Sequence, residues 1–298
     1  MILLAKAAHA IHERMSELSR QPTVLSIQSQ VVSARVGNSV AALAMERLGV
    51  RALQVPTTLL GRRPDQGPPG GGPIPVANFT SLLEGLIADG RLAQIDAVLT
   101  GYLGDPEQVP AILDIVERIK AANPRAILVC DPVLGDEGSL FVSEAIADAV
   151  VNGLWPNADW LAPNAFELGV ISGRGIESLE HARDAARRIG KPMLVSSLRT
   201  ATGIGNLYAA PGGGDWFCET TRLPRAPKGA GDLLTALWLA RRLKGETAAI
   251  SLEGATGAVY DVIVRSLAFE SEDLALPHAH ELLAEPVTWP RARKLELA

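Results

Sequence analysis

The feature that most constrains this chain is a regular alternation of short apolar segments with longer segments of helical periodicity. The apolar segments are rich in Val, Leu and Ile and have the length of strands buried on both faces. They lie at 23–27, 52–55, 97–100, 126–130, 160–162 and 193–196. The helical patterns lie at 39–48, 77–88, 108–122, 143–151 and 179–189. This order predicts an α/β fold with a mostly parallel sheet and helices on both faces.

The second half of the chain departs from this alternation. Residues 205–221 contain two short strand-like runs around a Pro-Gly-Gly-Gly turn, which predicts a hairpin at an edge of the sheet. Two long helices are predicted over 230–243 and 246–269. We therefore expect residues 22–285 to form a single domain, followed by a surface tail over 286–298.

Residues 1–21 are expected to be an N-terminal extension of this domain. Their apolar positions have helical spacing, which favours an added structural helix or a frayed leader over an oligomer contact. Charged and histidine side chains follow the short apolar start, so we do not expect the segment to act as a signal peptide.

The composition excludes several classes of function. The net charge of −5 gives no basic footprint for nucleic acid, so a phosphate-bearing partner must be small and held locally. No apolar run reaches the roughly 18 residues that span a bilayer, so no membrane association is expected. Two cysteines, Cys130 and Cys218, cannot form a disulfide framework, which favours a reducing compartment such as the cytoplasm.

The strongest chemical signal is the motif Lys-Gly-Ala-Gly-Asp at 228–232, directly before an apolar helical run. A helix that starts on such a glycine turn presents unpaired N–H groups and the positive end of its dipole. We therefore expect Gly229, Ala230 and Gly231 to form an anion cradle. Asp232 has two interpretations: it caps the helix, or it takes a proton from a hydroxyl that attacks a phosphoryl group.

Two further acidic motifs stand just past predicted strands. Asp131 follows the strand at 126–130, where it either caps a turn or serves a cation- or phosphate-linked role. Asn164 and Glu167 lie three residues apart, which fits either a capping box or the ligands of a hydrated Mg²⁺. Ligands of such sheets bind beyond the carboxyl ends of the strands. Three acidic sites at that edge favour phosphoryl transfer over three unrelated caps.

At these motifs the chain resembles the pyridoxal kinases of the ribokinase superfamily. The similarity runs over about residues 24–269, and six segments occur in the family's order. They lie at 25–32 with 37–39, 99–104, 130–135, 162–167, 196–197 with 205–206, and 229–232. Sugar kinases of the superfamily share the last segment but lack the Ser-Ile-Gln-Ser opening of the first. The resemblance implies a ribokinase-like three-layer αβα sandwich.

The resemblance also implies an activity, the ATP-dependent phosphorylation of the 5′-hydroxymethyl group of pyridoxal, pyridoxine or pyridoxamine in vitamin B6 salvage. It implies that Ser29 hydrogen-bonds the pyridine ring, that Tyr102 packs on that ring, and that Val31 belongs to the same substrate site. Asp232 corresponds to the catalytic base.

The nucleotide side of the site is implied in the same way. The residues that the resemblance places around ATP are Asp131, Asn164, Glu167, Ser196, Gly229, Ala230 and Gly231. Asp131 and Glu167 correspond to the carboxylates that hold Mg²⁺. The resemblance further implies a homodimer, and it makes a monovalent cation such as K⁺ a candidate cofactor for which the sequence shows no site of its own.

The clearest departure from the family follows the second predicted strand, where many members have Phe-Ser-Asn-His-Thr. Pro64, which has no hydroxyl, replaces the substrate-contacting threonine. Either Arg62, Arg63 or Asp65 substitutes, or the substrate differs. Our hypothesis is that Arg62 and Arg63 hold polyphosphate or ring substituents, and the alternative is a solvated basic pair.

This departure keeps other functions open. One is a kinase for another hydroxymethyl heterocycle, such as hydroxymethylpyrimidine, or for a sugar. Another is a vitamer-binding protein without turnover, which the intact acidic and glycine motifs disfavour.

The same region is rich in glycine and proline. Residues 61–75, here called the lid segment, contain five glycines and five prolines. We expect an unstructured loop that is mobile without ligand and closes over nucleotide and substrate.

Overall fold

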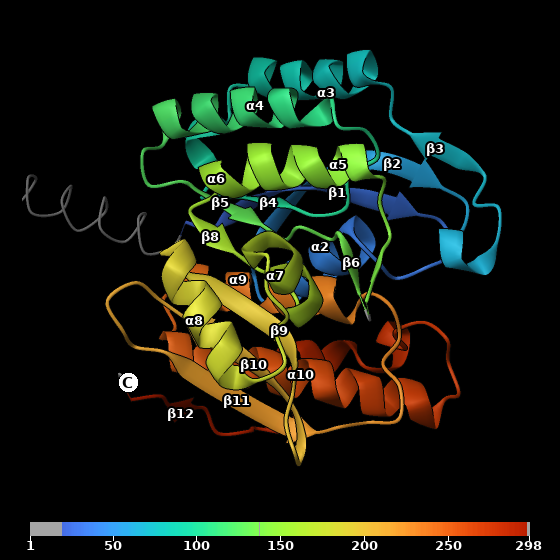
Figure 1. Cartoon of the computed structure of the whole chain (residues 1–298). Coiled ribbons are helices and arrows are strands. Elements are labelled where there is room, and N and C mark those ends of the chain that lie inside the picture. Colours follow the sequence, from blue (N-terminus) through green and yellow to red (C-terminus); the bar gives the residue numbers. More distant parts are fainter. Residues whose placement is uncertain (1–19, 137, 297–298) are drawn as a thin grey trace, which may run out of the picture.

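The computed structural model describes residues 20–136 and 138–296. Of the predicted N-terminal extension, residues 1–19 therefore lie outside the described residues. The remaining elements form a layered α/β structure around one large sheet (Figure 1).

The sheet has ten strands in the order β12-β11-β10-β9-β8-β5-β4-β1-β2-β3 within the described residues. Their bounds are β1 Thr23–Val31, β2 Arg51–Leu60, β3 Gly71–Pro73, β4 Ala97–Thr100, β5 Ile127–Cys130, β8 Trp160–Leu161, β9 Met193–Arg199, β10 Gly203–Ala209, β11 Trp216–Thr221 and β12 Arg293–Lys294. The central strands, from β9 to β2, run parallel, and antiparallel pairs stand at both ends. The predicted mostly parallel α/β sheet is confirmed.

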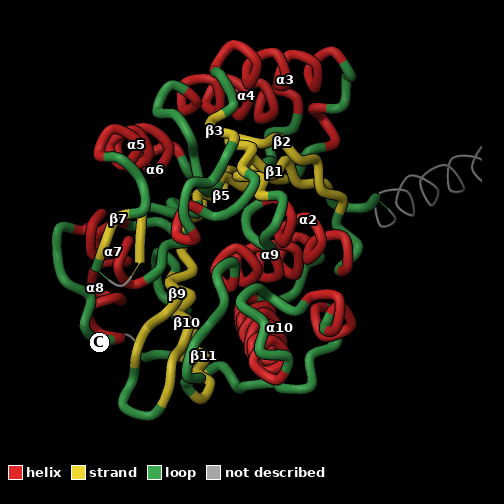
Figure 2. The backbone as a smooth tube through the Cα atoms, turned by 90° about the vertical axis from the view of Figure 1, so that its right-hand side faces the viewer, coloured by secondary structure: helices red, strands yellow, loops and turns green. Residues whose placement is uncertain are grey.

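Helices cover both faces of the sheet, as Figure 2 shows from the side. On one face lie α2 (Asn38–Arg47), α9 (Ala230–Leu243) and α10 (Ala248–Ala268). On the other lie α3 (Val76–Ala88), α4 (Gln108–Ala122), α5 (Glu144–Ala149), α6 (Trp155–Asn157), α7 (Ala165–Ser172) and α8 (Leu179–Ile189). Each face has its own hydrophobic core, so the molecule is the three-layer αβα sandwich that the sequence predicts.

Local sequence explains why these elements form. In α4, Ile112, Ile115 and Ile119 are fully buried, and their spacing of three and four residues places them on one helix face. All of β4 is buried because a central strand of such a sheet is covered on both sides.

The first strand is longer than its apolar pattern predicts. β1 continues through polar residues to Val31 because their side chains find partners inside the fold. The Ser26 hydroxyl donates to Asn38 Oδ1 at 2.8 Å, and Gln28 Nε2 donates to the Ser26 hydroxyl at 2.9 Å. These hydrogen bonds satisfy the buried polar side chains, so a central strand can contain them.

The predicted hairpin over 205–221 is present as the antiparallel pair β10–β11, but it is not the edge of the sheet. The C-terminal segment, predicted to be a surface tail, returns as β12 and pairs with β11. The amides of Val287 and Thr288 donate to Asp261 Oδ2 at 2.6 and 2.9 Å, and the Ala292 amide donates to Glu253 Oε1 at 2.9 Å. The described part of this segment is largely exposed but is held to the domain by contacts between residues far apart in sequence, which no local pattern predicts.

The lid segment is not the unstructured loop that its composition predicts. β3 pairs antiparallel with β2, and a 3₁₀ turn occupies Pro64–Gln66. A Cβ at Gly71 (φ 74°) would lie 2.0 Å from the Leu59 carbonyl oxygen, so this pairing requires glycine. Because β3 is an edge strand, it also tolerates Pro73. Mobility and closure of the lid segment stay predictions.

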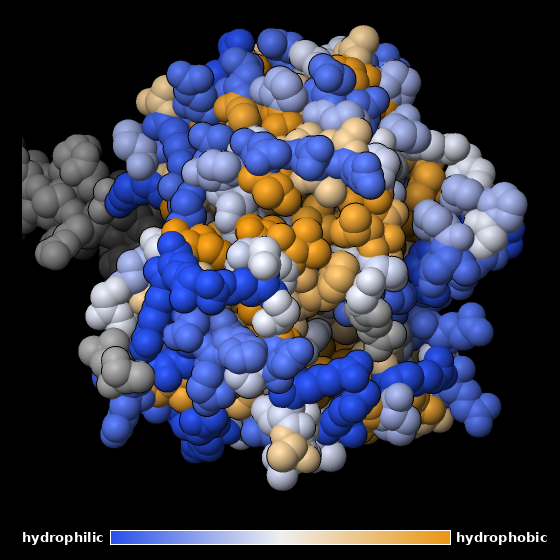
Figure 3. Space-filling model, viewed as in Figure 1, coloured by the Kyte–Doolittle hydropathy of each residue, from blue (hydrophilic) through white to orange (hydrophobic). Residues whose placement is uncertain are grey.

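One face of the molecular surface carries a band of apolar side chains. Figure 3 shows apolar side chains gathered across the middle of the face drawn in Figure 1, with hydrophilic side chains above and below them. None of the helices in the described part of the chain is long and apolar enough to cross a membrane.

Candidate active site

Five strands end at the same edge of the sheet because they run parallel. Tyr102 stands two residues beyond β4, Asp131 directly after β5, and Asn164 three residues beyond β8. Ser29 lies near the end of β1, and Ser196 lies within β9. The sequence therefore places its candidate residues at the edge where ligands of such sheets bind.

The glycine motif forms the start of α9. Gly229 is the N-cap residue with φ 92°, and a Cβ there would lie 2.2 Å from the Arg35 carbonyl oxygen. Only glycine fits this approach. Ala230 and Gly231 open the first turn of a 14-residue helix, whose leading N–H groups have no partners within the helix. These residues have the geometry of an anion cradle.

Asp232 lies in the first turn of α9, beside the cradle. Its Oδ2 accepts a hydrogen bond from the Gly37 amide at 2.9 Å and not from its own helix, so in the described structure the carboxylate joins two segments. Burial raises the pKa of Asp232, and the Gly37 hydrogen bond opposes that rise. A carboxylate with a raised pKa is a better proton acceptor, which suits a general base.

Asp131 is bound to the same helix, α9. Its Oδ2 accepts from the Thr235 hydroxyl at 2.8 Å, one turn further along α9. Burial raises the pKa of Asp131 well above its ordinary value, and the charges of Glu167 and Asp232 raise it further. Asp131 therefore lies close enough to both other carboxyl groups for their negative charges to disfavour its ionised form.

Glu167 forms the capping box that the sequence left as one of two alternatives. Glu167 Oε2 accepts from the Asn164 amide, and Asn164 Oδ1 accepts from the Glu167 amide, both at 2.9 Å. Glu167 Oε1 also accepts from the amides of Leu134 at 2.8 Å and Gly135 at 3.4 Å. Burial raises the pKa of Glu167 to about 7 against these hydrogen bonds. Glu167 therefore fixes the loop after β5, and both of its oxygens are already used.

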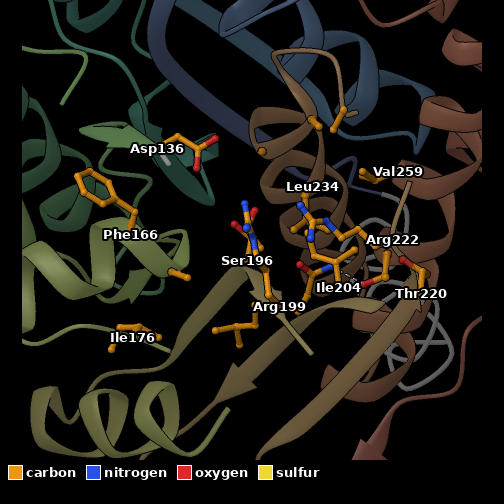
Figure 4. A pocket seen from close by; sticks show the side chains of 18 of the residues that line it. Asp136, Phe166, Ile176, Ser196, Arg199, Ile204, Thr220, Arg222, Leu234 and Val259 are labelled. Carbon is orange, nitrogen blue, oxygen red and sulfur yellow. Dashed lines mark hydrogen bonds between the residues drawn. The ribbon is translucent and has the colours of Figure 1, made fainter. Parts of the chain in front are cut away.

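A cavity of about 1280 Å³ lies beside the cradle. It is lined from α7, β9, β10, the 222–228 segment, α9 and α10, and Ala230 and Gly231 form part of its wall. In Figure 4, Ser196 and Arg199 lie between the side of α7, marked by Phe166, and the side of the C-terminal helices, marked by Leu234 and Val259. The cavity lies at the predicted nucleotide side of the site.

The cavity wall carries cations that the sequence reasoning missed. They are Arg174, Arg199, Arg222, Arg225 and Lys228, against the acidic side chains of Asp136 and Glu177. Apolar side chains, among them Ile176 and Ile204, line it as well. The available signal was the basic residue at every third position of 222–228, just before the glycine motif. Cationic and apolar walls together suit a ligand with an anionic part and an apolar part.

The predicted substrate residues lie apart from this cavity. Ser29 is buried where the pairing of β1 with β2 shifts register between Gln28 and Gln30, a bulge that re-aims a side chain. The Tyr102 carbonyl accepts from the Thr57 hydroxyl at 2.6 Å, and burial raises the pKa of the Tyr102 phenol. Val31 packs in a small apolar cluster with Ala34 and Leu60. None of Ser29, Val31 and Tyr102 lines the cavity.

The remaining candidates have clear surroundings. Arg63 is bound to Asp65 and to Asp273, whereas Arg62 Nε donates within the lid segment to the Pro68 carbonyl at 2.9 Å. Cys130 and Cys218 are buried, and burial raises the pKa of each thiol to about 12. A thiol with so high a pKa is a poor nucleophile.

The chain matches the family model described as phosphomethylpyrimidine kinase over residues 43–276. It is 35% identical over 288 residues to a pyridoxal kinase of Pseudomonas entomophila, covering 93% of this chain and 99% of that protein. It is 34% identical over 275 residues to a pyridoxal kinase of Burkholderia thailandensis, covering 89% and 96%.

Solved structures share the fold. A pyridoxal kinase from Entamoeba histolytica has a TM-score of 0.86 at 23% identity, covering 92% of this chain and 100% of that chain. A pyridoxal kinase from Leishmania donovani, in complex with ADP and pyridoxine, has a TM-score of 0.86 at 25% identity, covering 92% and 99%. A putative phosphomethylpyrimidine kinase from Bacteroides thetaiotaomicron has a TM-score of 0.85 at 20% identity, covering 93% and 99%.

Proposed function

The chain belongs to the phosphomethylpyrimidine kinase family, and from this premise we propose that it is an ATP-dependent kinase that phosphorylates the 5′-hydroxymethyl group of pyridoxal. The relatives that are 34–36% identical to it are pyridoxal kinases. Pyridoxine and pyridoxamine carry the same hydroxymethyl group and are further acceptors. The reaction belongs to vitamin B6 salvage.

The observation that carries the proposal is the position of Asp232 beside the anion cradle. Asp232 takes the proton of the substrate hydroxyl as that oxygen attacks the γ-phosphorus of ATP, and ADP leaves. The raised pKa of Asp232 supports this role. The amides of Gly229, Ala230 and Gly231 stabilise the negative charge on the transferring phosphoryl group.

The cavity beside the cradle supports a nucleotide site. Ala230 and Gly231 form one end of its wall, where the γ-phosphate lies. Its five cations balance the negative charge of the phosphates, and Ser196 and Asn206 supply polar atoms. Asn206 is held by the Thr256 hydroxyl, to which its Nδ2 donates at 3.0 Å. Ser29, Val31 and Tyr102 bind the acceptor ring on the other side of Asp232.

The carboxylates fit Mg²⁺ bound mainly through phosphates and water. Within the described ranges, no group of three or more His, Cys, Asp or Glu side chains is arranged to hold a metal ion. Mg²⁺ commonly uses only one or two carboxylates. Asp131 and Glu167 would hold the ion through water, because oxygens of both side chains already accept hydrogen bonds within the protein. When bound, Mg²⁺ neutralises phosphate charge.

Three further properties belong to this proposal. The enzyme works in the cytoplasm, which the two buried free thiols support. It forms a homodimer, as its resemblance to pyridoxal kinases implies, and light scattering of the purified protein tests this. K⁺ acts as an additional activator, which a comparison of rates in potassium and sodium buffers tests.

A second acceptor has specific support. The matching family model is described by a pyrimidine substrate, and Pro64 in the lid segment cannot supply a hydroxyl to a pyridine ring. Hydroxymethylpyrimidine is therefore the second candidate, and its hydroxymethyl group meets the same base and cradle.

A coupled ADP-release assay separates these candidates. Pyridoxal, pyridoxine, pyridoxamine, hydroxymethylpyrimidine and ribose are offered in parallel at equal concentration with ATP and Mg²⁺. The proposal expects the highest kcat/KM for pyridoxal and no release without an acceptor. A higher kcat/KM for hydroxymethylpyrimidine than for pyridoxal would mean that hydroxymethylpyrimidine is the acceptor. Binding of pyridoxal without any ADP release would support a vitamer-binding protein.

A further inference from the structure

One arginine of the lid segment, Arg63, forms an ion pair with Asp273, in the segment that follows α10. Arg63 Nη1 donates to Asp273 Oδ1 at 2.6 Å. The same guanidinium donates to Asp65 from Nε at 3.0 Å and from Nη2 at 3.2 Å, a two-pronged contact. The Arg63 side chain is only 12% exposed, although it belongs to a surface segment. Such forked arginine–carboxylate contacts are stronger and more directional than ordinary surface pairs.

Asp273 belongs to a firmly anchored stretch, residues 271–276, here called the strap. Leu274 and Leu276 are buried in the core, and the Ala275 amide donates to the buried Ser266 hydroxyl at 2.9 Å. The partner of Arg63 is therefore held by the core of the molecule and not by another loop. An ion pair to such a support costs less side-chain freedom than a pair between two mobile groups.

The strap lies against the start of the anion cradle. Asp273 forms an isolated parallel bridge with Lys228, the residue before Gly229. Gly229 in turn lies against the Arg35 carbonyl, two residues before the Gly37 amide that binds Asp232. One chain of contacts thus runs from the lid segment through the strap to the cradle and the base.

Arg63 differs in its surroundings from the cations of the nucleotide cavity. It does not line that cavity, and its guanidinium is shared by two carboxylates. Its hydrogen bond to Asp65 lowers the pKa of that carboxyl, so the contact favours the charged carboxylate. A phosphate group would have to displace both acids before it could bind Arg63.

We propose that Arg63 is a positioning residue that latches the lid segment onto the strap beside the cradle and does not itself bind phosphate. This inference rests on the proposed function, because it assigns how the lid is held over the acceptor. The latch holds the lid segment against the strap, beside the residue that precedes the cradle, and a lid held there shields the hydroxyl and the γ-phosphate from water.

Steady-state kinetics in both substrates test the latch. Arg63→Ala and Asp273→Ala each remove it from one side. We expect each to raise the KM for pyridoxal about 5- to 20-fold while kcat and the KM for ATP change less than about threefold, the size expected for a partly buried ion pair. The double variant is expected to match the single variants, because both remove one interaction.

The matched control is Arg118→Ala, which removes another Arg–Asp ion pair, with Asp114 at 2.8 Å on α4. For this variant, kcat and the KM values for pyridoxal and ATP are all expected to stay at the wild-type values. A large rise in the KM for ATP in Arg63→Ala, with the KM for pyridoxal unchanged, would mean that Arg63 binds phosphate and would overturn the latch. Additive effects in the double variant would overturn it too.

Hydrogen exchange supplies a readout that does not depend on turnover. In the lid segment the Gly61 amide donates to the Gly70 carbonyl at 3.2 Å, and the Arg62 amide donates to the Pro69 carbonyl at 3.1 Å. Loss of the latch is expected to speed exchange of both amides at least about threefold, with exchange in α4 unchanged. Unchanged lid exchange in both variants contradicts the latch. If no acceptor is phosphorylated by the wild type, the proposed function fails while this comparison still decides the latch.

Discussion

At the scale of single residues, the three buried carboxyl groups around the cradle determine both chemistry and stability. Asp131, Glu167 and Asp232 each have a raised pKa, with burial as the first cause. Burying a carboxyl charge costs stability at neutral pH, even where hydrogen bonds offset part of that cost. Their retention beside an anion cradle is typical of a functional site that costs stability.

Replacing Asp131 by Asn is predicted to stabilise the ligand-free protein at high pH. A carboxyl whose pKa is higher in the folded state favours folding below its unfolded pKa, and this contribution is lost as pH rises through the folded pKa. Asn does not titrate, so the variant escapes the loss. We expect its melting temperature to exceed that of the wild type by roughly 2–4 °C at pH 8, with the difference vanishing near pH 4.

Thermal melts of both proteins from pH 4 to pH 8 make this measurement. The Asn side chain still accepts the Thr235 hydroxyl hydrogen bond, so the comparison isolates the charge. A variant that is less stable than the wild type at every pH contradicts the prediction.

The pH dependence of turnover reports on Asp232. Because burial raises its pKa, the unprotonated base disappears at a higher pH than it would for an exposed aspartate of pKa about 3.9. We expect kcat to fall as pH decreases, and we expect the fall to occur at a pH clearly above the pKa of an exposed aspartate. A kcat that stays level down to pH 4 would exclude Asp232 as the base.

At the scale of elements, the start of α9 requires glycine at one position. Gly229→Ala would place a Cβ 2.2 Å from the Arg35 carbonyl in a conformation with φ 92°, so we expect lower stability by about 2 kcal/mol or more and a loss of activity. Gly85→Ala in α3 is the control, because a Cβ there meets nothing within 4 Å. That variant is expected to gain about 0.5–1 kcal/mol in denaturant unfolding. Equal effects of the two substitutions would contradict the assignment.

The C-terminal segment is predicted to be part of the folded domain. Deleting residues 286–298 removes the amides that donate to Asp261 and Glu253, both only 9% exposed. Each buried acceptor left without a partner costs about 1–3 kcal/mol, so the melting temperature is expected to fall by roughly 5 °C or more. Val287→Ala, at a side chain that is 82% exposed, serves as the control and should melt with the wild type. An unchanged melting temperature of the truncated chain would mean that the segment does not stabilise the domain and is only a surface tail.

The same elements show what the sequence could predict. The bounds of α4, α8 and β4 follow from periodicity and apolar runs, because each is stabilised by its own pattern against the core. β3 and β12 were missed because they are too short for any pattern and exist through pairing with distant strands. The cavity cations were missed for the same reason, since Arg174 and Arg225 meet only after folding.

At the scale of the whole molecule, the order of six motifs predicted the family before any geometry was known, and the comparisons confirm it. Most of the motifs lie in or just after a parallel strand of the sheet, so their order in sequence fixes their arrangement along one edge, whereas the last motif opens α9 after the antiparallel strand β11. The lid segment lies outside this rule. Its contacts run to the strap, more than 200 residues away, and the residues alone do not reveal them.

The central claim is that this edge of the sheet transfers a phosphoryl group from ATP to pyridoxal with Asp232 as the base. The most direct test is the formation of pyridoxal 5′-phosphate from ATP and pyridoxal by wild type and Asp232→Asn. The account predicts one pyridoxal phosphate for each ADP in the wild type, and a kcat lower by about 10²–10⁴-fold in Asp232→Asn at unchanged fold. Wild-type turnover by Asp232→Asn, or no pyridoxal phosphate from the wild type, would contradict it.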